Sequence, residues 1–211
     1  INSFIETIKY PISFFDYETF PSAIPRFAGY SPFDQIPFQF SLHVIEENGR
    51  EPVHHEFLFT DKGNPDNELI AALHASMPQA GSVVTWSKSF EMTINRRLGS
   101  RHEKEVEYLT DMNGRMIDLR DPFSDQLFVH PEFKGKTSIK SVLPVLVQKG
   151  QVSYKDLVIQ EGATATETWN RIVTGEMTKN EIEVARKNLL AYCCLDTLAM
   201  VLILRELQNS V

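Results

Sequence analysis

The sequence predicts an α/β fold in which a mixed central sheet is flanked by helices. Strand-like segments come first, at residues 12–18, 39–46 and 55–59, and the turn-forming run Glu47-Asn48-Gly49-Arg50 predicts an antiparallel hairpin. Helix-like and strand-like segments alternate from residue 65 onward, which is typical of parallel strands joined by helices. A hairpin followed by this alternation predicts strands of both directions in one sheet.

The first strand-like segment is the apolar run Ile12-Ser13-Phe14-Phe15, continued by Asp16-Tyr17-Glu18. Residues 21–37 are rich in proline and too irregular for regular structure. A loop of that length is either functional, as one wall of a substrate channel, or a packed structural loop. Its aromatic residues agree with both interpretations.

The rest of the chain predicts mainly helices. We expect strands at 82–86 and 116–119, and helices at 65–77, 89–98, 100–110, 138–147, 165–174 and 178–207. Thr178 is a suitable N-cap for the last helix, with Glu181 three residues later as its capping-box partner. Apolar side chains recur at helical spacing along this helix, at Ile182, Ala185, Leu189, Tyr192, Cys193, Met200 and Ile203.

Composition predicts one soluble globular domain over residues 1–211, with 42% hydrophobic and 23% charged residues. No apolar stretch reaches transmembrane length and residues 1–10 do not resemble a signal peptide, so we expect no membrane partner. The sequence begins without methionine, so we expect it to be part of a longer protein with unknown neighbouring domains.

Cysteine usage predicts a reducing, cytoplasmic location. Cys193 and Cys194 are adjacent on the predicted helix and point in different directions, so we expect two buried thiols and no bridge between them. No Cys/His grouping has the spacing of a zinc site. The His54-His55 pair lies in a predicted strand, where at least one ring should face solvent, and we assign neither a metal role.

Asp16 and Glu18 end the first strand and project on the same side, because side chains of a strand alternate. Two like charges beside an apolar strand need compensation, and a divalent cation provides it through carboxylate oxygens. Ordinary turn chemistry is an alternative, and so is the metal-free acid–base work of paired carboxylates in glycosidases.

Asp196 interrupts the apolar stripe of the last helix, one turn after Tyr192. A carboxylate on a buried stripe is costly unless it is paired or bound to a metal. The alternatives are an aspartate at the edge of the stripe that pairs with Arg or Lys, and a tyrosine that serves as a core aromatic.

Together, Asp16-Tyr17-Glu18-Thr19 and the Tyr192-x-x-x-Asp196 spacing resemble the first and third motifs of DnaQ-like 3′–5′ exonucleases. These belong to the ribonuclease H-like superfamily, in the subgroup with tyrosine in the last motif. The sequence also resembles an uncharacterised bacterial domain family assigned to that superfamily. That likeness covers nearly the whole chain, through Phe15-Asp16-Tyr17-Glu18-Thr19-Phe20, Ile36-Pro37-Phe38-Gln39-Phe40-Ser41, His130-Pro131-Glu132-Phe133-Lys134-Gly135 and Leu195-Asp196-Thr197-Leu198-Ala199-Met200.

The second motif departs from the family pattern of asparagine followed by Phe-Asp. Ser87 stands at the asparagine position and Phe90-Glu91 at the Phe-Asp position. The longer Glu91 can reach a metal directly or through water, or it can serve as a first-turn acid favoured by the helix dipole. Asp118 is the rival fourth carboxylate, or a supporting residue, and Asp121 beside Pro122 is expected to form a turn.

The resemblance implies a ribonuclease H-like sheet and a metal-dependent nuclease, most simply a 3′–5′ exonuclease. Asp16, Glu18, Glu91 and Asp196 would hold two Mg²⁺ or Mn²⁺ ions about 4 Å apart. Tyr192 would orient or help deprotonate the attacking water, and an ordinary tyrosine pKa near ~10 makes a positioning role easier than a full base role at neutral pH.

Nucleic acid, with a single-stranded end, is the expected partner despite a formal charge of −7, because phosphate binding needs only a local positive potential. Lys134, Lys136 and Lys140 form one basic cluster near a helix start, and His130 precedes it. Arg96, Arg97, Arg101 and Lys104 form a second basic cluster. Such clusters are equally typical of a solvated face.

Phe20, directly after the first motif, is expected either to stack on a terminal base or to fill the core. Two other function classes remain open. One is a catalytically weakened nuclease fold that binds nucleic acid or a protein, motivated by Glu91. The other is a different hydrolase, for example one acting on sugars, which would keep Asp16 and Glu18 far from Asp196.

Overall fold

The computed structural model describes residues 1–147 and 152–210, which form a five-stranded sheet with helices on both faces. The strands are β1 (Ile12–Pro21), β2 (Gln35–Ile45), β3 (Val53–Leu58), β4 (Ser82–Thr85) and β5 (Met116–Asp118). They lie in the order β3-β2-β1-β4-β5. The β1–β2 and β2–β3 pairs are antiparallel and the β1–β4 and β4–β5 pairs are parallel, which confirms the predicted mixed α/β sheet.

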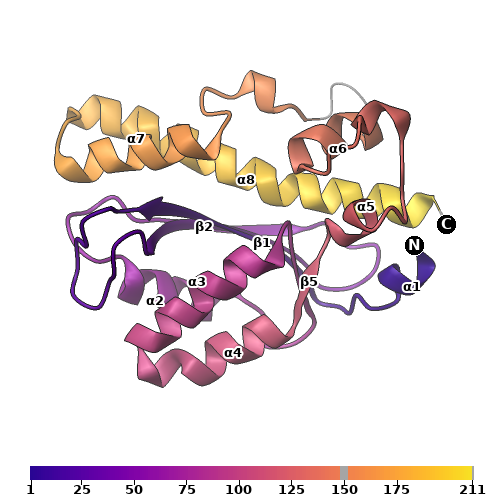
Figure 1. Cartoon of the computed structure of the whole chain (residues 1–211), viewed down its shortest axis with the longest axis horizontal. Coiled ribbons are helices and arrows are strands. Elements are labelled where there is room, and N and C mark those ends of the chain that lie inside the picture. Colours follow the sequence, from indigo (N-terminus) through magenta and orange to yellow (C-terminus); the bar gives the residue numbers. More distant parts are fainter. Residues whose placement is uncertain (148–151, 211) are drawn as a thin grey trace.

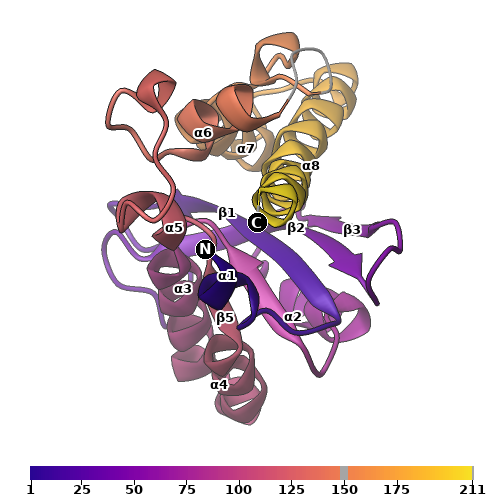
Figure 2. The ribbon, with the colours of Figure 1, turned by 90° about the vertical axis from the view of Figure 1, so that its right-hand side faces the viewer.

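Two groups of helices cover the two faces of this sheet (Figure 1 and Figure 2). On one face lie α6 (Ile139–Leu146), α7 (Gly162–Thr174) and α8 (Lys179–Asn209). On the other face lie α2 (Asp66–Ser76), α3 (Lys88–Arg101) and α4 (Val106–Gly114). The shorter elements are α1 (Asn2–Ile5), α5 (Asp121–Ser124) and the 3₁₀ turns η1 (Glu103–Glu105), η2 (Pro131–Phe133) and η3 (Tyr154–Asp156).

β1 separates two hydrophobic cores. Phe14 packs into the core under α8, whereas Phe15 and Tyr17 pack into the core beside α2, α3 and α4. Asp16 and Glu18 have the same parity as Phe14 and therefore face α8. Full burial of one phenylalanine side chain stabilises the fold by about 1.5–3 kcal/mol, so a one-residue slip of β1 would be strongly unfavourable.

α8 is the central helix of its layer and contacts β1, β2, β3 and β4. It begins with the predicted capping box, in which Thr178 and Glu181 satisfy each other's backbone amides. By length and composition α8 can cross a membrane, contrary to the sequence expectation, but most of its apolar stretch is buried in the fold. The described chain is therefore a soluble-type domain, and α8 is its core helix.

Some boundaries differ from prediction. The helix predicted at 100–110 exists with other bounds, because α3 continues through Gly99 to Arg101 and α4 spans Val106–Gly114. Gly99 lies beside Val106, and a Cβ atom added at Gly99 would make an ordinary van der Waals contact of 3.5 Å with the Val106 side chain. Part of the predicted 21–37 loop is sheet, because β2 begins at Gln35. Asp121, expected in a turn, is the first residue of α5.

Candidate functional site

Acidic residues from the two ends of the chain line one cavity, with a volume of about 380 Å³. Asp16 and Glu18 reach it from β1, and Asp196 reaches it from α8. Tyr192 lies one helical turn before Asp196 and lines the same cavity. The lining is completed by Tyr17, Trp86, Ser87, Arg120, Ser138, Ile139, Lys140 and Met200. This arrangement is the opposite of the separation that the sugar-hydrolase alternative expected.

Asp16 lies at the centre of the acidic group. Burial raises the pKa of its carboxyl well above the usual range, and the charges of Asp196, Glu18 and Glu91 raise it further. One oxygen each from Asp16 and Glu18 and the sulfur of Cys193 lie within 4.8 Å of one another. The Cys193 thiol donates a weak hydrogen bond of 3.8 Å to Oδ2 of Asp16. The carboxylates therefore share a confined space in which their charges repel.

The carboxyl groups of Glu18 and Asp196 also have raised pKa values in this environment. Burial, followed by the charge of Asp196, raises the pKa of Glu18 to about 8 even though Lys140 opposes the shift. Burial raises the pKa of Asp196 to about 6, while the hydrogen bond from Tyr154 and the charge of Lys140 lower it. The positive charge of Lys140 therefore lowers the pKa values of Glu18 and Asp196, but it does not bring them back to the ordinary carboxyl range.

Glu91 lies in the first turn of α3 and is only 2% exposed. Its Oε2 atom has no hydrogen-bond partner among the described residues. Burial raises its pKa to about 8, and its charge acts on Asp16 and Glu18. An unpartnered buried carboxylate oxygen beside other carboxylates fits the oxygen-rich ligand set that hard divalent cations take. Asp16, Glu18 and Asp196 line the cavity and Glu91 does not, and these four carboxylates are the residues that could hold such ions.

Asp118, the rival fourth carboxylate, is occupied by backbone amides and takes the supporting role. Its Oδ1 accepts hydrogen bonds from the backbone amides of Ser87 and Arg120, both at 3.0 Å, and its Oδ2 accepts one from Lys88 at 2.9 Å. Ser87 has a left-handed backbone with φ of 81° and lines the cavity. Asp118 therefore holds the start of α3, and with it the cavity wall that precedes Glu91.

Tyr192, Lys140 and Tyr154 form a polar rim around the acidic group. Lys140 Nζ donates hydrogen bonds to the Tyr192 hydroxyl at 3.3 Å and to the Gln160 carbonyl at 2.6 Å. The same ammonium group lies 5.1 Å from the ring centroids of both tyrosines. Burial, then the charges of Asp196 and Glu18, raise the pKa of Tyr192 far above its ordinary value, so its phenol keeps its proton at neutral pH.

The first residue of α7, Gly162, lies beside Glu18 and Tyr192. A Cβ atom added at Gly162 would lie 3.9 Å from Oε2 of Glu18 and 4.0 Å from the Tyr192 hydroxyl. Thr166, one turn later, donates a hydrogen bond to the backbone carbonyl of Thr19 in β1. The start of α7 is therefore attached to the strand that carries Asp16 and Glu18.

Phe20 lies in an aromatic group rather than along the cavity. Its ring centroid is 5.6 Å from that of Trp169, and the guanidinium of Arg26 lies over the ring at 4.1 Å. The core-filling alternative describes this environment better than a free stacking platform.

Of the basic residues predicted to contact substrate, one lines the cavity and the others do not. Lys140 lines the cavity, whereas the cavity lining includes neither Lys134 nor Lys136, which are exposed before α6. His130 is exposed, and its Nδ1 accepts a hydrogen bond from the backbone of Glu132. Arg120 lines the cavity and was missed, because nothing in its local sequence distinguishes it from other surface arginines.

Tyr154 and Cys193 were also missed as parts of the site. Tyr154 precedes Asp196 by 42 residues, and no spacing rule connects the two. The structure brings them together through a hydrogen bond from the Tyr154 hydroxyl of η3 to Oδ1 of Asp196. Cys193 was expected in the core, which is where it lies, but its contact with Asp16 depends on how α8 crosses β1.

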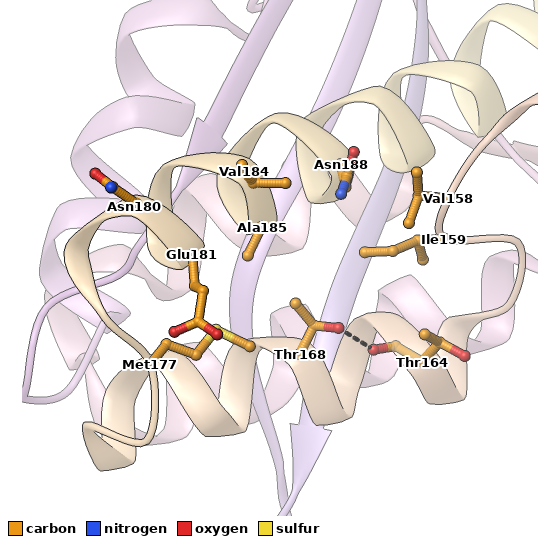
Figure 3. Close-up of a pocket in the computed structure, with 10 residues that line it drawn as sticks. All are labelled: Val158, Ile159, Thr164, Thr168, Met177, Asn180, Glu181, Val184, Ala185 and Asn188. Carbon is orange, nitrogen blue, oxygen red and sulfur yellow. Dashed lines mark hydrogen bonds between the residues drawn. The ribbon is translucent and has the colours of Figure 1, made fainter.

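A second cavity, of about 400 Å³, lies between α7 and α8 (Figure 3). Its lining is mainly apolar and includes the exposed side chains of Val158 and Val184. Glu181, which also lines it, accepts hydrogen bonds from Thr178 as part of the helix cap. This cavity offers a surface for apolar groups but no cluster of acid–base residues, so we assign no reaction to it.

A family model described as "Domain of unknown function (DUF2779)" matches residues 13–138. The matched segment includes Asp16, Glu18, Glu91 and Asp118 and ends before Lys140. No solved structure gives a significant match to the chain.

Three curated relatives of this chain are each named as an "Uncharacterized protein". MG366 of Mycoplasma genitalium is 26% identical over 94% of this chain and 32% of its own length. UU173 of Ureaplasma parvum is 26% identical over 89% of this chain and 30% of its own length. The MG366 homolog of Mycoplasma pneumoniae is 28% identical over 90% of this chain and 31% of its own length. The chain thus spans about a third of the curated relatives it matches.

Proposed function

The chain belongs to the family described as "Domain of unknown function (DUF2779)", and from its acidic cavity we propose that it is a metal-dependent nuclease acting as a 3′–5′ exonuclease. The observation that carries the proposal is the shared cavity of Asp16, Glu18 and Asp196, which come from opposite ends of the chain. The mixed sheet, with two acids on its first strand and one on its last helix, is the arrangement expected of a ribonuclease H-like exonuclease.

The donor set fits two hard divalent cations such as Mg²⁺ or Mn²⁺. Asp16, Glu18 and Asp196 line a confined space, the pKa values of these three carboxyls and of Glu91 are raised, and Oε2 of Glu91 has no partner among the described atoms. When bound, such ions would neutralise these carboxylates and supply positive charge for the attacking and leaving oxygens of phosphodiester hydrolysis. Asp16, Glu18, Glu91 and Asp196 would hold them.

The neighbouring residues have separate tasks. Tyr192, which keeps its proton at neutral pH, orients the attacking water by donating a hydrogen bond rather than by removing a proton. Lys140 and Arg120 line the cavity and bind non-bridging phosphate oxygens. The Trp86 ring lies on the same lining and offers a face on which a terminal base can stack. Tyr154 holds the Asp196 carboxylate in place.

Cleavage of end-labelled single-stranded DNA and RNA in Mn²⁺ tests the proposal. We expect a ladder that shortens from the 3′ end, and we expect Asp16→Asn and Asp196→Asn each to abolish it. Glu183→Gln, on the exposed side of α8, is the matched control and should keep the ladder. Internal cuts would make the protein an endonuclease, and absence of any cleavage by the metal-loaded wild type would contradict the proposal.

Glu91 favours one alternative, a weakened nuclease fold that binds nucleic acid without cutting it. Glutamate stands where the resembled family has aspartate, one methylene shorter. The alternative expects nucleic-acid binding to survive Asp16→Asn with no cleavage by the wild type. It also expects Glu91→Asp to create or increase activity, whereas the nuclease proposal expects Glu91→Asp to leave activity equal or lower.

A further inference from the structure

A second group of metal-ligand side chains lies on the other flank of α8, over β2 and β3. His43 of β2 and His54 of β3 are directly opposite each other in the antiparallel register, and their rings stack with centroids 4.4 Å apart. Cys194 of α8 lies above them. One ring nitrogen of each histidine and the sulfur of Cys194 lie within 4.8 Å of one another.

The group is oriented by buried hydroxyl groups. Thr197 donates to the Cys194 carbonyl at 3.2 Å, so its oxygen accepts from Nδ1 of His43 at 2.8 Å and from the Ser41 hydroxyl at 2.7 Å. Ser41 in turn accepts from Nε2 of His54 at 2.9 Å. This proton assignment leaves Nε2 of His43 and Nδ1 of His54 as unprotonated nitrogens.

The unprotonated nitrogen of His54 faces the thiol, since its Nδ1 lies 3.9 Å from Sγ of Cys194. In metal sites the ligating histidine nitrogen is the one opposite a hydrogen-bonded N–H, which fixes the ring and its tautomer. Both histidines already have that arrangement through Ser41 and Thr197. Each of these imidazoles therefore has one N–H held by a buried hydroxyl and one nitrogen free to ligate.

Two imidazoles and one thiolate form a ligand set of intermediate softness, which suits Zn²⁺ rather than Mg²⁺ or Mn²⁺. Zinc usually takes four ligands in a tetrahedron. Glu56 follows His54 by two residues, so it lies on the same face of β3, and it is paired with Ser41 in the register. Its negative charge acts on both His54 and Cys194. Glu56 or water can therefore complete the shell.

From this geometry we propose that the chain binds a zinc ion through His43, His54 and Cys194, separately from the acidic cavity. The Cys194 thiol would release its proton to solvent on binding. The ion would join β2, β3 and α8, and so fix the helix that carries Tyr192 and Asp196. The adjacent cysteines then belong to different sites, because Cys193 contacts Asp16 on one flank of α8 and Cys194 contacts His54 on the other.

Cobalt substitution tests this proposal without any measurement of nuclease activity. The chain is stripped with a chelator and titrated with Co²⁺, then with Zn²⁺. We expect a cobalt–thiolate absorption band that saturates at a single ion and disappears when Zn²⁺ displaces cobalt. Zn²⁺ should also raise the Tm of the stripped protein. Absence of the thiolate band from the wild type would overturn the proposal.

Neighbouring residues provide matched controls. Cys194→Ser and His54→Ala should lose the band, whereas Cys193→Ser and His55→Ala, whose side chains point away from the group, should keep it. Thr197→Val keeps all ligands and should weaken Zn²⁺ binding by about 10–100-fold through loss of the orienting hydrogen bonds. Circular dichroism of the stripped variants shows whether each one is folded.

The acidic cavity can also bind cobalt, and Asp16→Asn separates the two sites. The thiolate band should survive Asp16→Asn, because that residue belongs to the cavity alone. The opposite result would be a band that survives Cys194→Ser but is lost in Cys193→Ser. It would mean that the thiolate ligand is Cys193, beside Asp16, and it would overturn the proposed zinc site. The cobalt test is read by absorption and not by cleavage, so it remains valid even if the nuclease proposal fails.

Discussion

The hydroxyl of Tyr154 donates a hydrogen bond of 2.5 Å to Oδ1 of Asp196, and it lowers the pKa of that carboxyl against the effect of burial. Tyr154 comes from η3 and Asp196 from α8, so the contact joins a short turn to the core helix. It gives the buried aspartate a fixed orientation before any cation binds.

Tyr154→Phe should therefore weaken Mn²⁺ binding to the acidic cavity by about 10–100-fold, the usual effect of losing a partner of a metal ligand. The ring remains, so the fold should be kept. Loss of the hydrogen bond raises the pKa of Asp196, so the defect should be larger at pH 6 than at pH 8. Calorimetric titration at both pH values measures it. Tyr10→Phe, at a surface tyrosine, is the control, and an equal loss there would contradict the assignment.

The metal-free protein should lose stability as the pH rises through the neutral range. The folded-state pKa values of Glu18, Glu91 and Asp196 are about 8, about 8 and about 6, above the ordinary carboxyl range. Groups with raised folded-state pKa values stabilise the fold below their unfolded-state pKa, and that contribution is lost as the pH rises through the folded-state pKa. The free energy of unfolding in chelator should thus fall between about pH 5 and pH 8.

Urea denaturation at several pH values, with and without Mn²⁺, measures this dependence. Bound cations should flatten the decline because they neutralise the same carboxylates. Glu18→Gln should reduce the slope in chelator, and Glu183→Gln should not, since Glu183 is exposed. A metal-free protein that becomes more stable up to pH 8 would show that the cluster is not repulsive.

Lys140→Met should weaken substrate binding, because Lys140 is the lysine that lines the cavity. Loss of a phosphate contact lowers the salt dependence of binding, with a slope smaller by about 1. The substitution also removes a charge that lowers the pKa values of Glu18 and Asp196. Affinity for single-stranded oligonucleotide, measured across a range of salt concentrations, tests this effect. Lys134→Met is the matched control, and an equal effect there would identify a diffuse basic face instead.

Asp118→Ala should destabilise the start of α3. Three backbone amides lose their acceptor, and removal of a helix-capping side chain costs about 0.5–2 kcal/mol. Release of the left-handed Ser87 backbone would also move the wall that precedes Glu91, so cleavage should fall together with stability. Chemical denaturation and the cleavage assay measure the two effects, with the exposed Asp125→Ala as control. Unchanged stability would exclude the capping role.

Much of the architecture followed from local sequence patterns. Thr178 and Glu181 formed the predicted capping box, and the hairpin of β2 and β3 formed around the predicted turn. These features depend on residues close together in the chain, so they are visible to pattern analysis. The boundary between α3 and α4 was misplaced, because α3 continues through Gly99 to Arg101 and no local breaker marks that end.

The proposed zinc-ligand group shows the limit of spacing rules most directly. His43, His54 and Cys194 come from three elements, and the third lies 140 residues after the second. No short motif connects them, and the sequence assigned His54 no metal role. The strand register and the path of α8 bring them together.

The sequence by itself determined that Asp16 and Glu18 share one side of β1 and that Tyr192 and Asp196 share one side of α8, because side-chain direction follows the local period of strand or helix. Only the tertiary structure decided that these two sides face each other, that Glu91 is buried with an unpartnered oxygen while its charge acts on Asp16 and Glu18, and that Tyr154 and Arg120 join the site. Contacts between distant elements depend on how complete faces pack, and packing is a property of the whole core rather than of any segment.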